Sequence, residues 1–237
     1  MLSSPDFLQS GRMKPELRRV GTSQSPVVVI DGFSGDARGI VEIAAALAPF
    51  PSSAGTYYPG LRRILSAADG AAWAYVQQTL EAAAPFLGGA FDFDRFDLLE
   101  ASFSMVTAPP ATLTPAQRAP HFDSADPDYV AILHYLADTP GTAFYRQRST
   151  GIETISDANR ETFVDAARRE SASLTGYTNG PNGHFEQIGS VEGVADRLAI
   201  YQGRLLHSGL IPEDMTFSAD PRRGRLTANL FVKGYRA

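Results

Sequence analysis

A histidine and an aspartate stand two residues apart in the triplet His121-Phe122-Asp123, and a second histidine, His207, lies far downstream. Imidazole nitrogens and carboxylate oxygens together bind divalent transition metals. Alternate residues of a strand point to the same face, so His121 and Asp123 can aim together while Phe122 turns away. If His207 approaches from a neighbouring strand, three ligands occupy one face of a metal ion and leave its other positions open.

The triplet alone is weak evidence, because Pro120 precedes it and the turn-forming run 124–127 follows. A surface histidine beside a turn-forming aspartate is the alternative interpretation. The chain has only four histidines. Of the other two, we expect His134 to point away from the metal as a satisfied core residue and His184 to lie on a surface loop.

A strand near the end of the chain carries a second candidate feature. Arg225 and Thr227 share one strand face, whereas the alternate residues form an apolar core face. A guanidinium beside a hydroxyl suits the binding of a carboxylate. An outward strand face with ordinary surface residues is the alternative. Arg222 and Arg223 could also supply the cation, but only Arg225 leads the alternating strand.

These residues resemble the 2-oxoglutarate/Fe(II)-dependent dioxygenases, especially the prolyl-hydroxylase-like branch, over roughly residues 98–233. His121-Phe122-Asp123 is similar to the His-x-Asp motif of that superfamily, and His207 to its distal histidine. Arg225-Leu226-Thr227 is similar to the Arg-x-Ser element that binds the far carboxylate of 2-oxoglutarate. The run 133–136 resembles the strand whose tyrosine, here Tyr135, helps to hold that carboxylate, and 141–145 resembles a Gly-Gly-x-Leu strand in which Thr142 replaces the second glycine.

The resemblance implies an Fe(II)- and 2-oxoglutarate-dependent oxygenase that uses O2 to hydroxylate an unactivated C–H bond and releases succinate and CO2. It implies His121, Asp123 and His207 as metal ligands, and Arg225, Thr227 and Tyr135 as cosubstrate-binding residues. A carboxylate at Asp123 favours hydroxylation, since related halogenases have a small residue there. Two alternatives stay open: a cupin-like metalloenzyme that does not use 2-oxoglutarate, and a jelly-roll binding module with a vestigial metal site.

The implied fold is α+β with a mainly β core, a double-stranded β-helix or jelly-roll with supporting N-terminal helices. We expect a polar tail over 1–25, frayed or with one short edge strand, and a single oxygenase domain over 26–237. Within it, 26–97 supplies helical support, with helices from a cap at Ser34 to Ala48 and over Ala67–Pro85. Residues 98–237 form the β core, with strands expected at 197–201, 205–207 and 225–233. An insert over about 146–190, helical at 157–173, is either a lid or a structural addition.

Composition narrows the function further. The 237 residues carry a net charge of −5 without a basic block, which argues against nucleic-acid binding. No cysteine is present, so thiolate catalysis and cysteine-bound zinc are excluded. We expect a cytoplasmic protein with no signal peptide and no membrane span, acting on a small-molecule or peptidyl substrate. The loop carrying Tyr57, Tyr58, Arg62 and Arg63 is expected to be an ordinary polar loop, with an entrance to the site as the alternative. The oligomeric state is left open.

Overall fold

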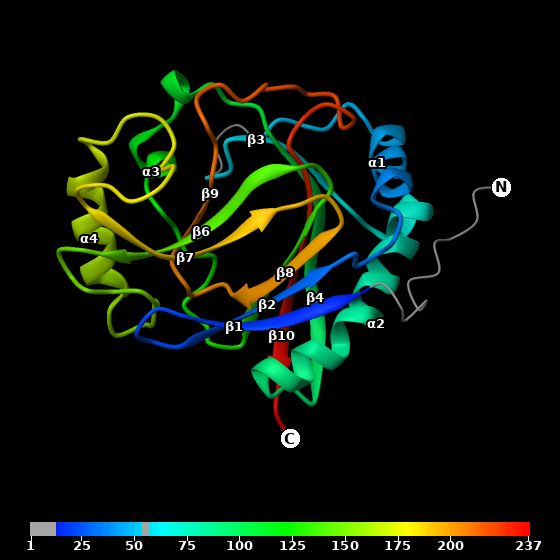
Figure 1. The fold of residues 1–237 in the computed structure, drawn as a ribbon, viewed down its shortest axis with the longest axis horizontal. Helices are drawn as coiled ribbons and strands as arrows, with labels where there is room; N and C mark the ends of the chain where they lie inside the picture. Colours follow the sequence, from blue (N-terminus) through cyan, green and yellow to red (C-terminus); the bar gives the residue numbers. More distant parts are fainter. Residues whose placement is uncertain (1–12, 54–56) are drawn as a thin grey trace.

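The computed structural model describes residues 13–53 and 57–237 (Figure 1). Two antiparallel sheets form its core, one of seven strands in the order β1-β2-β8-β5-β10-β4-β3 and one of three in the order β7-β6-β9. The large sheet consists of β1 (Lys14–Val20), β2 (Ser25–Asp31), β3 (Gly60–Ile64), β4 (Arg95–Val106), β5 (Tyr129–Tyr135), β8 (Arg197–Gln202) and β10 (Leu226–Tyr235). The small sheet consists of β6 (Thr139–Gln147), β7 (Phe185–Gly193) and β9 (His207–Gly209).

Helices cover the outer faces of both sheets (Figure 1). Helices α1 (Ala37–Ala46) and α2 (Ala71–Phe91) pack on the large sheet, whereas α4 (Arg160–Ser171) packs on the small one. Three short helical segments lie in the connections: η1 (Ala67–Asp69) before α2, and η2 (Pro110–Thr112) and α3 (Pro115–Arg118) between β4 and β5. None of the helices in the described ranges is long and apolar enough to cross a membrane.

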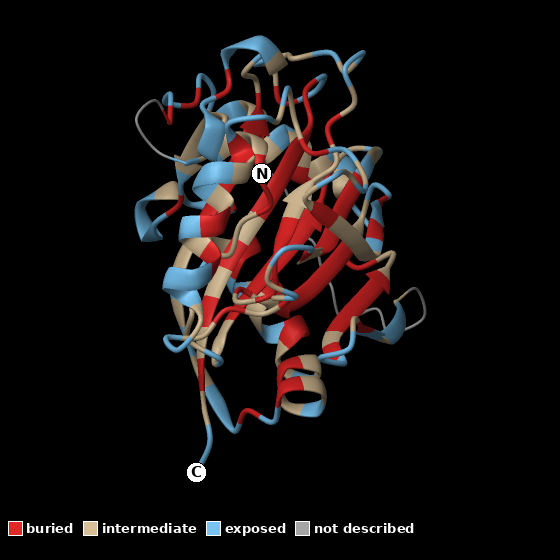
Figure 2. Ribbon diagram, turned by 90° about the vertical axis from the view of Figure 1, so that its left-hand side faces the viewer, coloured by how far each residue is buried: buried red, intermediate tan, exposed pale blue. Residues whose placement is uncertain are grey.

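The two faces of the large sheet differ in what they bury. On β10, the side chains of Leu226, Ala228, Leu230 and Val232 join the core between the sheet and the helices. The alternate residues Thr227, Asn229 and Phe231 line a pocket between the two sheets. This division confirms the alternation predicted from the sequence, and Figure 2 shows the resulting buried strands flanked by partly exposed helices.

The N-terminal helices differ from the expected ones at their ends. Asp36, rather than Ser34, caps α1 by accepting a hydrogen bond from the Gly39 amide. The Ser34 hydroxyl is committed elsewhere, because it donates to Asp196 Oδ1 at 2.5 Å. The second helix starts later than predicted, after η1, and continues through Pro85 to Phe91. Proline removes one backbone hydrogen bond, and the buried face on either side of it holds the helix together.

Two strands lie within the expected tail and the expected insert, and the one in the tail agrees with the edge strand considered there. The expected tail over 1–25 contains the edge strand β1, while residues 1–12 lie outside the described residues. The expected insert over 146–190 contains α4 but also the start of β7, which pairs with β6 along its length. Strand β9 begins at His207, whereas a strand ending there was predicted, because Leu205 closes a turn by bonding to the Gln202 carbonyl.

Candidate metal and cosubstrate site

Backbone hydrogen bonds bring the two candidate histidine ligands together. The His121 amide donates to the His207 carbonyl at 2.9 Å, and the His207 amide returns a bond to the His121 carbonyl at 2.8 Å. His207 also pairs with Phe144 of β6, so the bridge fastens the loop before β5 to the small sheet. The imidazole rings consequently lie 4.3 Å apart between centroids.

Asp123 reaches the same place from a bend. We expected a strand over 121–123, but only His121 makes a β-bridge, and the turn-forming residues that follow end the extended segment. The Asp123 amide donates to the Gly203 carbonyl at 2.7 Å. A Cβ atom on Gly203 would lie 3.1 Å from the Asp123 Cβ and 2.6 Å from the Tyr129 ring. The glycine therefore lets the loop approach closely enough to aim Asp123 at the histidines.

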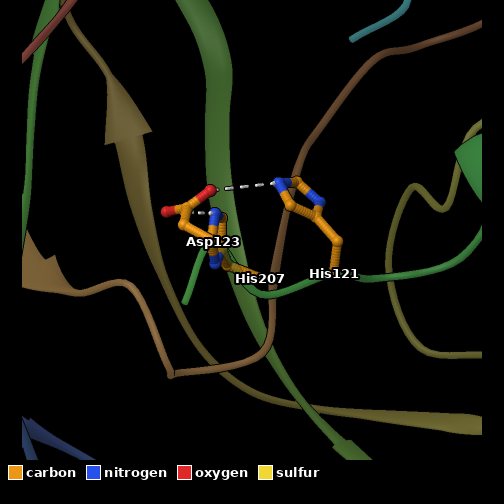
Figure 3. A group of neighbouring side chains, drawn as sticks. All are labelled: His121, Asp123 and His207. Carbon is orange, nitrogen blue, oxygen red and sulfur yellow. Dashed lines mark ion pairs between the residues drawn. The ribbon is translucent and has the colours of Figure 1, made fainter. Parts of the chain in front are cut away.

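The three side chains converge on one point, as Figure 3 shows. Asp123 Oδ1 lies 3.8 Å from His121 Nε2, and Asp123 Oδ2 lies 3.6 Å from His207 Nε2. One potential ligand atom from each residue falls within 4.8 Å of the others. Ligand atoms on one face of an octahedral ion, each about 2.1 Å from it, lie roughly 3 Å apart. Small side-chain rotations would therefore bring all three onto a single ion.

Hydrogen bonding and electrostatics prepare the donor atoms. His207 Nδ1 lies 2.7 Å from the Leu205 carbonyl, which requires the proton on Nδ1 and leaves the Nε2 lone pair for a metal. Burial and the neighbouring His207 hold the pKa of His121 well below its usual value, which keeps this imidazole neutral. Burial raises the pKa of Asp123, with His207 and Arg62 opposing it. A partly buried carboxylate with this bias would be stabilised by a divalent cation.

A pocket of about 950 Å³ opens beside the three residues, between the two sheets and α4. Arg225 and Thr227 line it, and both side chains are almost completely buried. Arg225 donates one hydrogen bond through Nη2 to the Gly141 carbonyl at 3.1 Å, and its Nε has no hydrogen-bond partner among the described residues. An unpartnered buried guanidinium nitrogen beside a pocket is suited to an anionic ligand.

The other two arginines considered for this role lie elsewhere. Arg222 forms a surface ion pair with Glu42 of α1, with nitrogen–oxygen distances of 2.6–3.1 Å. Arg223 is exposed. Of the three arginines, only Arg225 lines the pocket.

Tyr135 occupies the predicted face of β5, but its hydroxyl is already engaged. It donates to Thr142 Oγ1 at 2.7 Å, and of these two residues only Thr142 lines the pocket. Thr227 lies opposite Tyr135 in the strand register, and Arg225 acts electrostatically on the Tyr135 hydroxyl. Thr142 is thus a candidate cosubstrate contact, and Tyr135 positions it.

A family comparison covers almost the whole chain. Residues 11–232 match a family described as a family of unknown function, DUF6445. The chain belongs to that family. No curated protein matches the DUF6445 chain significantly.

Solved structures share the fold of the DUF6445 chain. HygX from Streptomyces hygroscopicus, with nickel and 2-oxoglutarate bound, aligns with a TM-score of 0.55 and 17% identity over 90% of this chain and 84% of its own. SnoN, a non-heme alpha ketoglutarate dependent epimerase from nogalamycin biosynthesis, aligns with a TM-score of 0.52 and 16% identity over 91% and 82%. These likenesses confirm the predicted double-stranded β-helix, the fold of 2-oxoglutarate/Fe(II)-dependent oxygenases.

Three tyrosines of the DUF6445 chain surround the candidate metal ligands. Tyr57 belongs to the loop that we expected to be an ordinary polar loop, and that expectation was wrong, because Tyr57, Tyr58 and Arg62 line the pocket. Tyr129 and Tyr201 were not assigned to the site from the sequence. The Tyr57 ring lies 4.7 Å from that of His121, and its hydroxyl donates to the Ala119 carbonyl at 2.8 Å. The Tyr201 ring meets His207 edge-on at 5.0 Å. Tyr129 also lines the pocket. The alternation of β5 and β8 could have indicated Tyr129 and Tyr201, but nothing local places the loop of Tyr57 against His121.

The two remaining histidines lie away from the pocket, as predicted. His134 is fully buried behind the large sheet, where Nδ1 meets the Tyr75 hydroxyl at 2.9 Å and Nε2 meets Asp196 at 3.1 Å. This bonding confirms that it is a satisfied core histidine. His184 precedes β7, and its Nε2 lies 2.9 Å from the Ser173 hydroxyl.

Proposed function

We propose that the protein is an Fe(II)- and 2-oxoglutarate-dependent oxygenase that hydroxylates an unactivated C–H bond of a small-molecule or peptidyl substrate, with release of succinate and CO2. One observation carries the proposal: two histidines and an aspartate converge in the same pocket that contains a buried arginine with an unpartnered nitrogen. A cytoplasmic location remains a prediction.

The residues present fit both groups that this activity requires. His121, Asp123 and His207 form the two-histidine, one-carboxylate set that non-haem Fe(II) oxygenases use. Arg225, with Thr227 and Thr142, would hold the far carboxylate of 2-oxoglutarate. When bound, iron with 2-oxoglutarate and O2 supplies the oxidising power for C–H cleavage.

The protein contributes positioning and shielding. Asp123 supplies a negative charge, and the two imidazoles supply nitrogen donor atoms. The backbone bridge between His121 and His207 keeps the two imidazoles adjacent. Arg225 sets the orientation of the cosubstrate by charge, and the pocket walls limit the access of water to the reacting groups. Arg225 also argues against the cupin-like alternative, because that alternative gives no role to a buried guanidinium with a free donor.

The test is the visible charge-transfer band expected when Fe(II) and 2-oxoglutarate are added together without oxygen. Asp123→Ala should abolish the band by removing a metal ligand. Arg225→Ala should weaken 2-oxoglutarate binding roughly 10- to 150-fold, the equivalent of one charged hydrogen bond. The exposed Arg223→Ala variant is the matched control and should bind like the wild type. An unchanged band in both Asp123→Ala and Arg225→Ala would refute the proposed function.

A further inference from the structure

The pocket contains an ion pair that the proposed metal and cosubstrate do not use. Arg62 of β3 and Glu100 of β4 both line the pocket, and Arg62 Nη2 bonds to Glu100 Oε1. In the strand register Arg62 lies opposite Ser104, four residues beyond Glu100, so its side chain extends along β4. Ser104 pairs with Thr227, so the arginine leans away from the cosubstrate end of the pocket.

Aromatic rings connect this pair to the metal ligands. The guanidinium carbon of Arg62 lies 5.8 Å from the centroid of the Phe231 ring, and Phe231 stacks on Tyr129 at 5.5 Å. Burial raises the pKa of Tyr129, the charges of Asp123 and Glu100 raise it further, and the charge of Arg62 lowers it. A Cβ atom on Gly203 would meet both the Tyr129 ring and the Asp123 side chain, so these two residues lie side by side. The Tyr129 hydroxyl therefore lies within electrostatic range of both a metal ligand and the ion pair. An apolar wall thus leads from the pair toward the metal.

The charged side chains that line the pocket limit the kind of substrate that this end of it can bind. The charged side chains lining the pocket in the described ranges are Arg62, Glu100, Asp123, Arg168 and Arg225. Asp123 and Arg225 serve the metal and the cosubstrate, and the exposed Arg168 pairs with Asp165 on its own helix at 3.6 Å. Apart from Arg168 on the exposed side of α4, the charged groups that remain for the substrate are one positive and one negative group side by side on β3 and β4.

Both partners keep bonding capacity for a ligand. Arg62 has five N–H donors, of which one is given to Glu100, and Glu100 Oε2 has no bonding partner among the described residues. Their side chains remain 26% and 37% exposed, so a ligand can reach them. A substrate with a single charge would pair with one of the two groups and compete with the other. A substrate with both charges would extend the pair into a four-membered network.

We propose that the substrate of the oxygenase is a zwitterion with adjacent ammonium and carboxylate groups, namely an α-amino acid with an apolar side chain. Its carboxylate would bind Arg62, its ammonium would bind Glu100, and its side chain would lie along Tyr129 and Phe231 toward the metal. This assignment rests on the proposed function and names the substrate class of the same site.

The experiment measures succinate formation with the apolar L-amino acids, each compared with its N-acetyl and carboxamide derivatives. The wild type should be stimulated above its substrate-free rate by a free amino acid, and the derivatives should show a KM roughly 10- to 150-fold higher. Arg62→Gln should remove the preference for the acid over the amide only. Glu100→Gln should remove the preference for the free amine over the acetylated one only. Arg169→Gln and Glu161→Gln, both exposed on α4, are matched controls that should keep both preferences.

The anaerobic Fe(II) and 2-oxoglutarate band separates the possible failures. Both variants should retain it, which also shows that they fold and that Arg62 is not the cosubstrate anchor. If the wild type forms the band but no amino acid stimulates succinate formation, the zwitterion assignment is refuted and the proposed function stands. The same holds if acids and amides, or free and acetylated amines, react equally well. A wild type without the band refutes the proposed function and this assignment with it.

Discussion

Protonation of Glu153 is expected to release the turn between β1 and β2 from the small sheet. The carboxylate is 5% exposed and accepts bonds from the backbone amides of Thr22 and Ser23, at 3.1 and 3.0 Å. Arg146 of β6 donates to it through Nε at 2.7 Å and also through Nη2. Gly21 makes room for this contact, because a Cβ there would lie 2.2 Å from Glu153 Oε2.

The size of the effect follows from the pKa. Burial alone would raise the pKa of Glu153, but the hydrogen bonds from Ser23, Arg146 and Thr22 lower it from 4.5 to about 2. A group whose pKa is depressed in the folded state stabilises that state above the unfolded pKa. The stabilisation is lost as the pH falls from about 4.5 toward 2. A shift of this size corresponds to roughly 3 kcal/mol of unfolding free energy.

The assay is urea denaturation of the wild type and Glu153→Gln at a series of pH values. Above pH 5 the wild type should be the more stable of the two, and this difference should shrink by roughly 3 kcal/mol as the pH approaches 2. Other carboxylates titrate equally in both proteins, so the difference isolates Glu153. Glu161→Gln, exposed on α4, should track the wild type at every pH. A constant difference between wild type and Glu153→Gln across this range would refute the reasoning.

Three further predictions concern substitutions in the sheets and in the pocket. Gly141→Ala should lower the free energy of unfolding by several kcal/mol in a thermal unfolding experiment, because the φ of Gly141 is +100° and a Cβ would lie 1.9 Å from a carbonyl of β7. Gly151→Ala, which is strained but in open space, should lower it by only about 1–2 kcal/mol. His134→Phe should lower the unfolding free energy by about 2–3 kcal/mol in urea yet leave the Fe(II) and 2-oxoglutarate band intact, since both ring nitrogens bond behind the sheet. Thr142→Val should weaken 2-oxoglutarate binding in titrations more than Tyr135→Phe, because only Thr142 lines the pocket; the reverse order would contradict the assignment.

The β core could be predicted because its strands alternate cleanly between apolar and polar residues. On β10 this pattern correctly separated the core face from the pocket face, and on β5 it separated His134 from Tyr135. Helix ends were less predictable, because local signals competed with tertiary contacts. Ser34 was a suitable cap for α1, but Asp196, far along the chain, binds its hydroxyl.

The residues of the candidate site could be inferred from the sequence, but their surroundings could not. The order of His121, Asp123, His207 and Arg225 predicted a metal beside an anion anchor, and the structure brings these residues to one pocket. The surroundings depended on contacts between distant segments that carry no local signal. Arg62 became a pocket residue only because β3 adds to the edge of β4.

The bridge between the histidines fixes the positions of the candidate metal ligands independently of their side chains. His121 and His207 are held by each other's main chain, and Asp123 by the main chain of Gly203, so these bonds persist when the side chains are exchanged. The backbone therefore keeps positions 121, 123 and 207 in place whichever side chains they carry. A new side chain there would change which ion is accepted while the loop remains in place, so this scaffold offers a route to altered metal selectivity without redesign of its fold.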